Sequence, residues 1–126
     1  RLRAAKVAGI AADIPELEVD DPDGADTLVL GWGSTYGAIG AAARRVRAEG
    51  RKVATAHLHH LNPFPRNTGE VVRSYEKVLI PEMNLGQLRM LIRAEFIVDA
   101  IGYNKVRGRP FRSAELADAM TALIES

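Results

Sequence analysis

The sequence predicts an α/β fold in which a parallel sheet carries helices on both of its faces. From Thr27 onward, short apolar runs typical of strands alternate with longer segments of helical periodicity. Residues 27–40 form an apolar strand that runs directly into glycines and a helix start, which is how open α/β sheets build a crevice at the carboxyl end of a strand. The 126 residues, 47% of them hydrophobic, fit one domain with a single core.

Residues 1–26 are expected to form an N-terminal helix and an edge strand or hairpin of that same domain. Residues 2–13 carry a thin stripe of small apolar residues, and Pro15 ends their helical pattern. Leu17 and Val19 alternate with acidic residues before a turn at 22–24, which indicates an edge strand or a hairpin with the next strand. Because six of the eleven residues in 16–26 are acidic, a solvated connector fits the pattern equally well.

Residues 27–126 are expected to form the α/β domain proper. The predicted strands are 27–31, 52–57, 77–82 and 97–101, and the predicted helices are 35–49, 68–75, 85–95 and 113–125. Asn67, followed three residues later by Glu70, predicts a capping box, while Asn84 and Ser113 are predicted to cap the last two helices. Right-handed crossovers on such a sheet imply one switch point, which the loop after residues 27–31 is expected to border.

Composition excludes several classes of function. The formal net charge is +1, so no global field draws the protein to nucleic acid or to a membrane surface. With no cysteine there is no disulfide framework, thiolate metal site or cysteine-ligated iron–sulfur cluster in this segment. No run of apolar residues is long enough to span a bilayer, and the first residues do not resemble a signal peptide, so a cytoplasmic location is the default expectation. The start at Arg1, inside a helical pattern, suggests a fragment of a longer subunit.

The glycine loop is the first candidate site. Gly31 and Gly33 allow close backbone approach, and Ser34 or Thr35 could cap the following helix, so that the loop could hold an anion. The spacing Gly31-x-Gly33-x-x-x-Gly37 is one residue longer than the common dinucleotide fingerprint, and the next strand ends in His57 instead of the acid that binds a ribose. The alternative is purely geometric: the glycines, with Gly37 and Gly40 on one helical face, let helix and sheet pack closely.

The histidines at 57, 59 and 60 are a possible metal site, since imidazole is a common zinc ligand. Three histidines without a carboxylate or thiolate nearby in sequence do not close a structural site, so hydrogen bonding at a strand end or an interface is the preferred interpretation. No metal ligand is therefore assigned.

Two loops are candidate interface elements. Asn62, Pro63, Phe64 and Pro65 form a stiff turn that presents one aromatic ring, either to a partner or to the domain's own core. Glu82, Met83 and Asn84 follow the strand 77–82, at the edge where the glycine loop should lie; Glu82 is expected to bond loop N–H groups or to face a partner.

Two basic segments have weaker functional signals. Arg89 and Arg93 share one face of the helix 85–95, which is typical of a solvated surface. Residues 102–112 gather four cations and could hold a phosphate group or an acidic protein, or form an exposed loop. No self-sufficient catalytic constellation stands out in the chain, and no catalytic residue is assigned.

Four ordered blocks resemble the C-terminal part of the α subunit of 2-oxoacid:ferredoxin oxidoreductases, most like the 2-oxoglutarate enzymes. They are LVLGWGSTYG at 28–37, HLHHLNPFP at 57–65, IPEMNLGQL at 80–88 and GRPF at 108–111. The resemblance implies a transketolase C-terminal-like domain: a three-layer α/β/α sandwich on a mostly parallel five-stranded sheet with one antiparallel strand, which would be Leu17 to Val19.

The resemblance also implies a function at the level of the holoenzyme. Such enzymes convert a 2-oxoacid and coenzyme A to an acyl-CoA and carbon dioxide and reduce ferredoxin, using thiamine diphosphate, Mg²⁺ and an iron–sulfur cluster. The family binds these cofactors on other domains or subunits, so this region is expected to be a non-catalytic assembly domain that contacts the β subunit and upstream domains of its own subunit. The competing hypotheses are an independent nucleotide-binding module that uses Gly31, Gly33 and Gly37, and a metal site at His57, His59 and His60.

Overall fold

A computed structural model describes residues 14–61, 63–82, 87–104 and 110–126. The strands are β1 (Val19–Asp20), β2 (Thr27–Trp32), β3 (Ala54–Leu58), β4 (Lys77–Glu82) and β5 (Ile101–Asn104). The helices are α2 (Tyr36–Ala48), α3 (Thr68–Arg73), α4 (Gln87–Phe96) and α5 (Ser113–Glu125), and a short 3₁₀ turn, η1 (Gly33–Thr35), precedes α2. The helix predicted over 2–13 and the cap predicted at Asn84 lie outside the described residues.

The described strands form one five-stranded sheet in the order β1-β3-β2-β4-β5. β2, β3, β4 and β5 are parallel, and β1 pairs antiparallel with β3. This confirms the mostly parallel sheet with one antiparallel strand. β1 lies at the edge beside β3 and does not form a hairpin with β2, so of the two alternatives for residues 16–26 the edge strand is the correct one.

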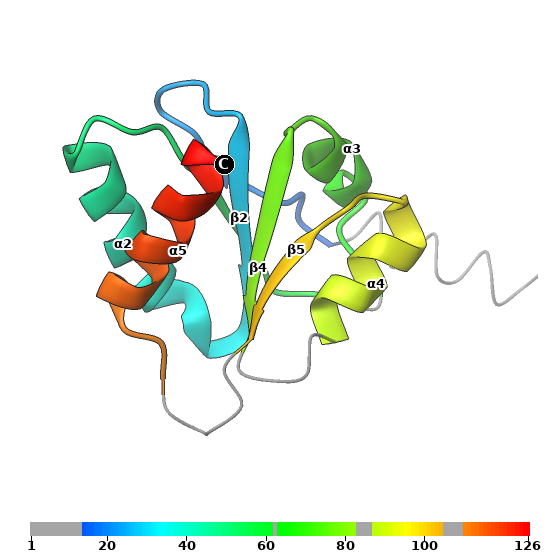
Figure 1. Cartoon of the computed structure of the whole chain (residues 1–126). Helices are drawn as coiled ribbons and strands as arrows, with labels where there is room; N and C mark the ends of the chain where they lie inside the picture. Colours follow the sequence, from blue (N-terminus) through cyan, green and yellow to red (C-terminus); the bar gives the residue numbers. More distant parts are fainter. Residues whose placement is uncertain (1–13, 62, 83–86, 105–109) are drawn as a thin grey trace, which may run out of the picture.

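Helices cover both faces of the sheet (Figure 1). On one face α2 and α5 bury Ile39, Val46, Leu116 and Met120 against Val29 and Leu79. On the other face α3 and α4 bury a second set against the alternate side chains of the same strands: Val72, Leu88, Ile92, Leu28, Leu30 and Ile80. The strands of a parallel sheet are buried on both faces, which is why the predicted strands are nearly continuous apolar runs.

Two predicted strand boundaries are wrong by several residues. The strand placed at 52–57 begins at Ala54, and the strand placed at 97–101 is β5, Ile101–Asn104. α4 continues to Phe96, and Ile97 then adopts the left-handed conformation (φ 55°) with its N–H donating to the carbonyl of Arg93. A left-handed residue does not continue an extended strand, so pairing with β4 starts only where Ile101 lies opposite Leu79.

The predicted caps differ from the observed contacts. Asn67 does not cap α3: its side-chain oxygen accepts from the N–H of Leu17 (2.7 Å), and its side-chain nitrogen donates to the carbonyl of Leu17 (2.9 Å). The side-chain amide of Asn67 thus forms the two hydrogen bonds with Leu17 that a neighbouring strand would form, and it holds in place the segment that leads into β1. Ser113 is the first residue of α5 and Arg112 precedes it; the N–H of Arg112 donates to Glu115 Oε1 (3.3 Å).

We expect Asn67→Ala to lower the free energy of unfolding by about 1–2 kcal/mol, because it leaves both backbone groups of Leu17 without this partner. The amide of Leu17 should also exchange with solvent faster than in the wild type, measured by hydrogen exchange. Arg66→Ala removes an exposed ion pair to Glu16 from the adjacent residue and serves as the control, with little expected change. Equal protection of Leu17 in both variants would contradict this role for Asn67.

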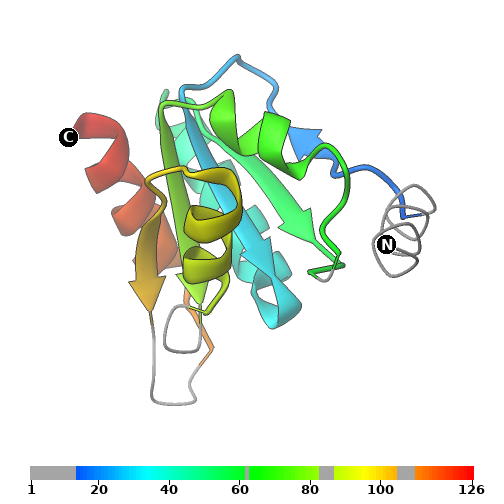
Figure 2. The same ribbon diagram turned by 90° about the vertical axis from the view of Figure 1, so that its right-hand side faces the viewer.

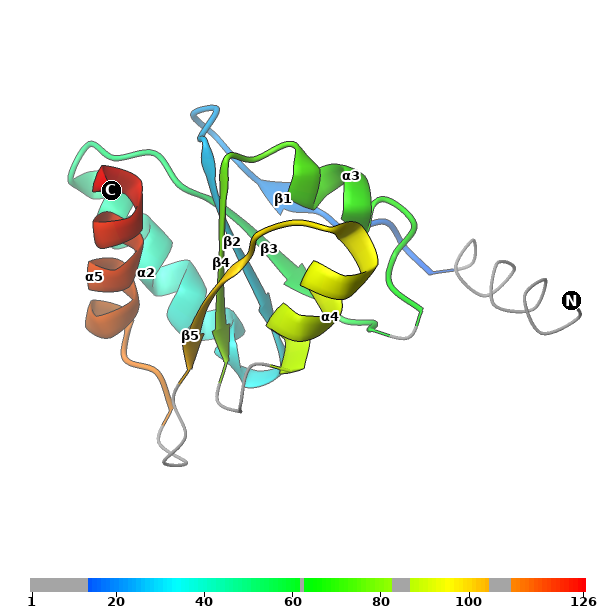
Figure 3. The ribbon, with the colours of Figure 1, turned by 45° about the vertical axis from the view of Figure 1, so that its right-hand side comes forward.

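Figures 2 and 3 show the arrows of the parallel strands pointing toward one edge of the sheet, where their carboxyl ends lie. The chain leaves β2 toward α2 on one face, whereas it leaves the adjacent β4 toward α4 on the opposite face. The helices that follow β2 and β4 therefore lie on opposite faces of the sheet, and the expected switch point lies between these two strands.

Candidate functional site at the carboxyl edge of the sheet

The glycine loop lies at the end of β2, as predicted. Its residues 31–35 form a tightly packed bend between β2 and α2, which we call the elbow. Gly33 has φ 67°, a conformation that favours glycine. Gly31 is buried under α2: a Cβ at this position would lie 2.4 Å from Ile39 Cδ1 and 3.0 Å from Thr35 Oγ1. The Thr35 hydroxyl donates back to the Trp32 carbonyl (3.0 Å) and does not cap α2. Ser34 and Gly33 are exposed.

The close approach of helix and sheet depends on Gly31, not on the residues expected to provide it. A Cβ at Gly37 would meet no atom within 4 Å, and one at Gly40 would lie 3.5 Å from the Arg44 guanidinium. Both residues lie on the open side of α2 instead of against the sheet. The prediction that Gly37 and Gly40 let this helix pack closely is therefore wrong for the described contacts.

Glu82 joins three elements at the switch point. It ends β4 with an exposed fraction of only 1%. Its carboxylate accepts from the N–H groups of Leu88 (2.7 Å) and Arg89 (3.2 Å) in the first turn of α4, and from the indole nitrogen of Trp32 at the end of β2 (3.3 Å). The N-terminus of a helix attracts an anion, and here the protein's own carboxylate supplies it.

Trp32 was not among the predicted site residues, because its contact with Glu82 depends on the register of two strands that are not consecutive in the chain. β2 and β4 pair in parallel with Thr27 opposite Lys77, and continuing that register by five residues places Trp32 opposite Glu82. Glu82 was expected to bond loop N–H groups or to face a partner; the N–H groups that it binds belong instead to the first turn of α4. Met83 and Asn84 lie outside the described residues.

The proline-rich loop is anchored from within. Phe64 is buried against the core on the α3 and α4 side, with its ring 5.5 Å from that of Phe96. The carbonyl of Pro65 accepts from both the N–H (3.0 Å) and the hydroxyl (2.7 Å) of Thr68. Pro65 is buried and Pro63 is half-buried, while Asn62 lies outside the described residues. Phe64 thus holds the loop in place, so a substitution there tests folding before it tests contact with a partner.

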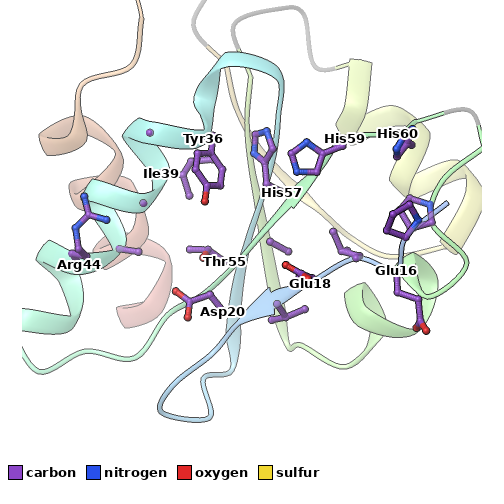
Figure 4. Close-up of a pocket in the computed structure, with 18 of the residues that line it drawn as sticks. Glu16, Glu18, Asp20, Tyr36, Ile39, Arg44, Thr55, His57, His59 and His60 are labelled. Carbon is purple, nitrogen blue, oxygen red and sulfur yellow. The ribbon is translucent and has the colours of Figure 1, made fainter.

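The three histidines do not converge. His57 is half-buried on β3, with its ring edge-on to Tyr36 (centroids 5.1 Å apart) and to His59 (5.2 Å), whereas His60 is exposed. No group of three histidine or carboxylate side chains in the described part of the chain could hold a metal ion. Figure 4 shows His57, His59 and His60 following one another along the end of β3.

The His57 ring has an unusual environment for a titratable group. Burial, followed by the proximity of His59, lowers its pKa below 6.5, while a hydrogen bond with the Gly33 backbone acts in the opposite direction. Its Nδ1 is buried, has no hydrogen-bond partner among the residues that the structure describes, and lies over Gly31, where a Cβ would be 3.2 Å away. The neutral ring is therefore part of the packing of the elbow.

This environment predicts acid-sensitive stability. The folded protein binds a proton at His57 less readily than the unfolded chain, so the stabilisation is complete above pH 6.5 and is lost as the pH falls below that value. We expect the difference in unfolding free energy between pH 7.5 and pH 5 to shrink in His57→Gln, measured by urea denaturation. His60→Gln, an exposed neighbour, should keep the wild-type dependence; equal profiles for all three proteins would contradict the assignment.

A groove of about 960 Å³ opens beside the elbow, between α2 and the edge formed by β1 and β3. Figure 4 shows Tyr36, His57 and His59 at its upper end, with Asp20 of β1 and Glu18, which directly precedes β1, below them, and Arg44 on α2. The sequence did not indicate this groove, because β1 was one of several interpretations of residues 16–26.

The two predicted basic features have surface positions. Arg89 and Arg93 lie on α4, and Arg93 approaches Asp99 at 3.9 Å with both side chains exposed, which fits a solvated face. Residues 105–109 lie outside the described residues, and at the ends of that loop Tyr103 stacks on Phe111 (5.6 Å). Among the residues that the structure describes, no helix is long and apolar enough to cross a membrane.

Solved structures share this architecture. A domain of 2-oxoglutarate:ferredoxin oxidoreductase from Magnetococcus marinus, solved with 2-oxoglutarate, coenzyme A and succinyl-CoA bound, superimposes with a TM-score of 0.85 at 32% identity, over 93% of this chain and 21% of that one. A split-gene transketolase (TM-score 0.63, 18% identity) covers 86% of this chain and 41% of that chain and shares the fold alone. The fold is that of transketolase-type α/β domains. In this chain the carboxylate of Glu82 lies at the switch point of that fold.

The sequence comparisons narrow this class to one family. The model for pyruvate:ferredoxin oxidoreductase core domain II matches residues 25–116, and the chain belongs to that family. It is 52% identical over 125 residues to 2-oxoglutarate oxidoreductase subunit KorA of Mycobacterium tuberculosis, covering 98% of this chain and 19% of that subunit. It is 36% identical over 105 residues to the α subunit of 2-oxoacid:ferredoxin oxidoreductase 2 of Aeropyrum pernix, covering 81% and 16%. The chain thus spans less than a fifth of the length of these curated relatives.

Proposed function

We propose that this chain is the non-catalytic assembly domain of a thiamine diphosphate-dependent 2-oxoacid:ferredoxin oxidoreductase, with 2-oxoglutarate as the substrate. The holoenzyme would convert 2-oxoglutarate and coenzyme A to succinyl-CoA and carbon dioxide and pass the electrons to ferredoxin in the cytoplasm. The similarity to the Mycobacterium tuberculosis subunit and to the Magnetococcus marinus enzyme supports the substrate. Thiamine diphosphate, Mg²⁺ and the iron–sulfur cluster would be bound by other domains or subunits.

One observation supports the proposed non-catalytic role. The crevice at the switch point is where open α/β sheets bind ligands, and the α4 N-terminus beside it is the natural place for an anionic group. In this chain the carboxylate of Glu82 already accepts from Leu88, Arg89 and Trp32, so a phosphate would have to displace a buried, hydrogen-bonded acid. The polar groups at this edge are used to connect β2, β4 and α4.

The elbow supports the same conclusion. Gly31 is covered by Ile39, and the hydroxyl of Thr35 is used within the loop, so of the four candidate anion-binding residues only Gly33 and Ser34 present their atoms to solvent. Assembly through this domain would involve the β subunit and upstream domains of the same subunit. The predicted contact residues were Asn62, Pro63, Phe64, Pro65, Glu82, Met83 and Asn84. Because Phe64, Pro65 and Glu82 are buried in the domain, they would support the contact edge from within, and of the described residues in this set only Pro63 is partly exposed for a partner.

Three measurements test the proposal. Calorimetry of the 126-residue chain with NAD, NADP, ATP and coenzyme A should give no binding in the micromolar range; micromolar binding would instead favour the independent nucleotide-binding module. The full-length subunit with its partner should reduce ferredoxin in the presence of 2-oxoglutarate, coenzyme A and thiamine diphosphate. Removal of residues 14–126 from that subunit should weaken association with the partner, and undiminished association would exclude an assembly role.

A further inference from the structure

The groove between α2 and the β1–β3 edge presents charged groups without partners. At its lower end Arg47 pairs with Asp20 (2.9 Å) and donates to the carbonyl of Val53 (2.7 Å), which ties α2 to β1. Glu18 and Arg44 lie on the two walls of the same groove, both exposed. Neither has a hydrogen bond or ion pair with any residue in the ranges that the structure describes.

The upper end of the groove is formed by rings. Tyr36 is 68% exposed and makes an edge contact with His57, and its ring lies across the groove mouth (Figure 4). The exposed ring of Tyr36 and the carboxylate of Glu18 line the same groove. Both attract a guanidinium or ammonium group, the ring through its quadrupole and Glu18 through its charge. Arg44 follows Tyr36 by eight residues on the same helix, about 12 Å away along its axis, and it favours an anion.

The side of the groove that α2 forms has no side chain at two positions, Gly37 and Gly40. Gly37 and Gly40 line the groove, and neither is needed for packing inside the domain, since a Cβ at Gly37 would meet no atom and one at Gly40 only the Arg44 side chain. A glycine inside a helix costs about 1 kcal/mol relative to alanine. Two such residues on an open helix face are explained by close approach of a chain from outside the domain.

We propose that this groove docks a segment of the partner subunit that places a lysine or arginine side chain between Tyr36 and Glu18, and an aspartate or glutamate beside Arg44. The inference deepens the proposed assembly role and rests on it. The opposite charges on the two walls fix the direction in which the segment lies, because reversing it would bring like charges together. Gly37 and Gly40 let its backbone approach α2.

The test uses the full-length subunit and its partner subunit. Tyr36 is replaced by the photo-crosslinking amino acid p-benzoylphenylalanine, and crosslinked peptides are identified by mass spectrometry. The expected product joins position 36 to a partner-subunit peptide that contains a lysine or arginine. The same replacement at Asp118, exposed on α5, is the control. Crosslinks from position 36 only to this subunit, or no crosslinks, would overturn the proposal.

Charge reversal gives a second readout. Glu18→Lys and Arg44→Glu are each expected to weaken subunit association about tenfold at low salt and to reduce its salt dependence, measured by surface plasmon resonance. Glu76→Lys, an exposed acid away from the groove, should leave the affinity unchanged. If removal of residues 14–126 weakens association but Glu18→Lys does not, the groove is wrong and the assembly role stands. If the removal has no effect, the assembly role itself fails.

Discussion

Replacing Glu82 by alanine is expected to lower the free energy of unfolding by about 3 kcal/mol. The substitution removes a buried acceptor that holds the N–H groups of Leu88 and Arg89 and the indole nitrogen of Trp32. Three donors then lose a charged partner in a place where water has little access, and each buried donor without a partner costs about 1–3 kcal/mol. Chemical denaturation measures the loss, which should appear with an unchanged m-value if the fold is retained.

The variant Glu82→Gln separates shape from hydrogen bonding. Glutamine fills nearly the same volume, but its amide nitrogen cannot accept, so one of the three donors loses its partner and the expected loss is about 1–2 kcal/mol. Glu95, on the exposed face of α4, has no side-chain hydrogen bond or ion pair among the described residues, so Glu95→Ala should change stability by less than about 0.5 kcal/mol. A Glu82→Ala protein as stable as Glu95→Ala would show that the carboxylate does not hold the switch point together.

The sequence predicted the architecture well because the apolar pattern has physical consequences that act locally. Strands buried on both faces must be continuous apolar runs, so β2 and β4 could be placed to within a residue of their observed bounds. The last helix, Ser113–Glu125, was predicted with its observed ends, since its apolar residues recur at helical spacing along its whole length. The resemblance to a known family implied one antiparallel strand and placed it at Leu17 to Val19, whereas the observed β1 is Val19–Asp20, and its position beside β3 was not predicted.

The errors in the fold have two different causes. Asn67 has the spacing of a cap, yet its side chain binds Leu17, fifty residues earlier in the chain, and this partner depends on which segments become neighbours after the sheet forms. Ile97 is a β-branched residue that local preference places in a strand, but it ends α4 in the left-handed conformation, with its N–H donating to the carbonyl of Arg93. The exact residue at which a helix ends is poorly determined by the apolar pattern alone.

Only part of the candidate site was predicted, because the rest depends on contacts between segments that are distant in the chain. Glu82 was singled out correctly as a polar group at the strand end, but its partner Trp32 required the register of two strands that are not consecutive in the chain. The groove beside Tyr36 required β1 to be placed at the far edge of the sheet. A functional surface formed by two distant segments has no signature in either segment alone.

Gly31→Ala is expected to destabilise the domain by about 2–3 kcal/mol through steric overlap alone. Its φ lies outside the left-handed region that favours glycine, so alanine meets no backbone penalty there. The added methyl group would lie 2.4 Å from Ile39 Cδ1 and 3.0 Å from Thr35 Oγ1, far inside van der Waals contact. Overpacking of this kind in a buried strand forces side chains off their rotamers or shifts the backbone. Thermal and urea denaturation of the variant measure the loss.

A double mutant identifies the cause, since Ile39→Val removes the Cδ1 atom that lies closest to the added methyl group. Ile39→Val alone should cost about 1 kcal/mol, whereas in the Gly31→Ala background it should restore part of the lost stability, which gives a coupling energy of opposite sign to the single effects. Gly37→Ala is the matched control: its Cβ meets nothing and it lies in α2, so alanine should stabilise the domain by about 0.5–1 kcal/mol. If Gly31→Ala were as well tolerated as Gly37→Ala, the elbow would have room for a side chain, and the argument that it is filled by the protein itself would fail.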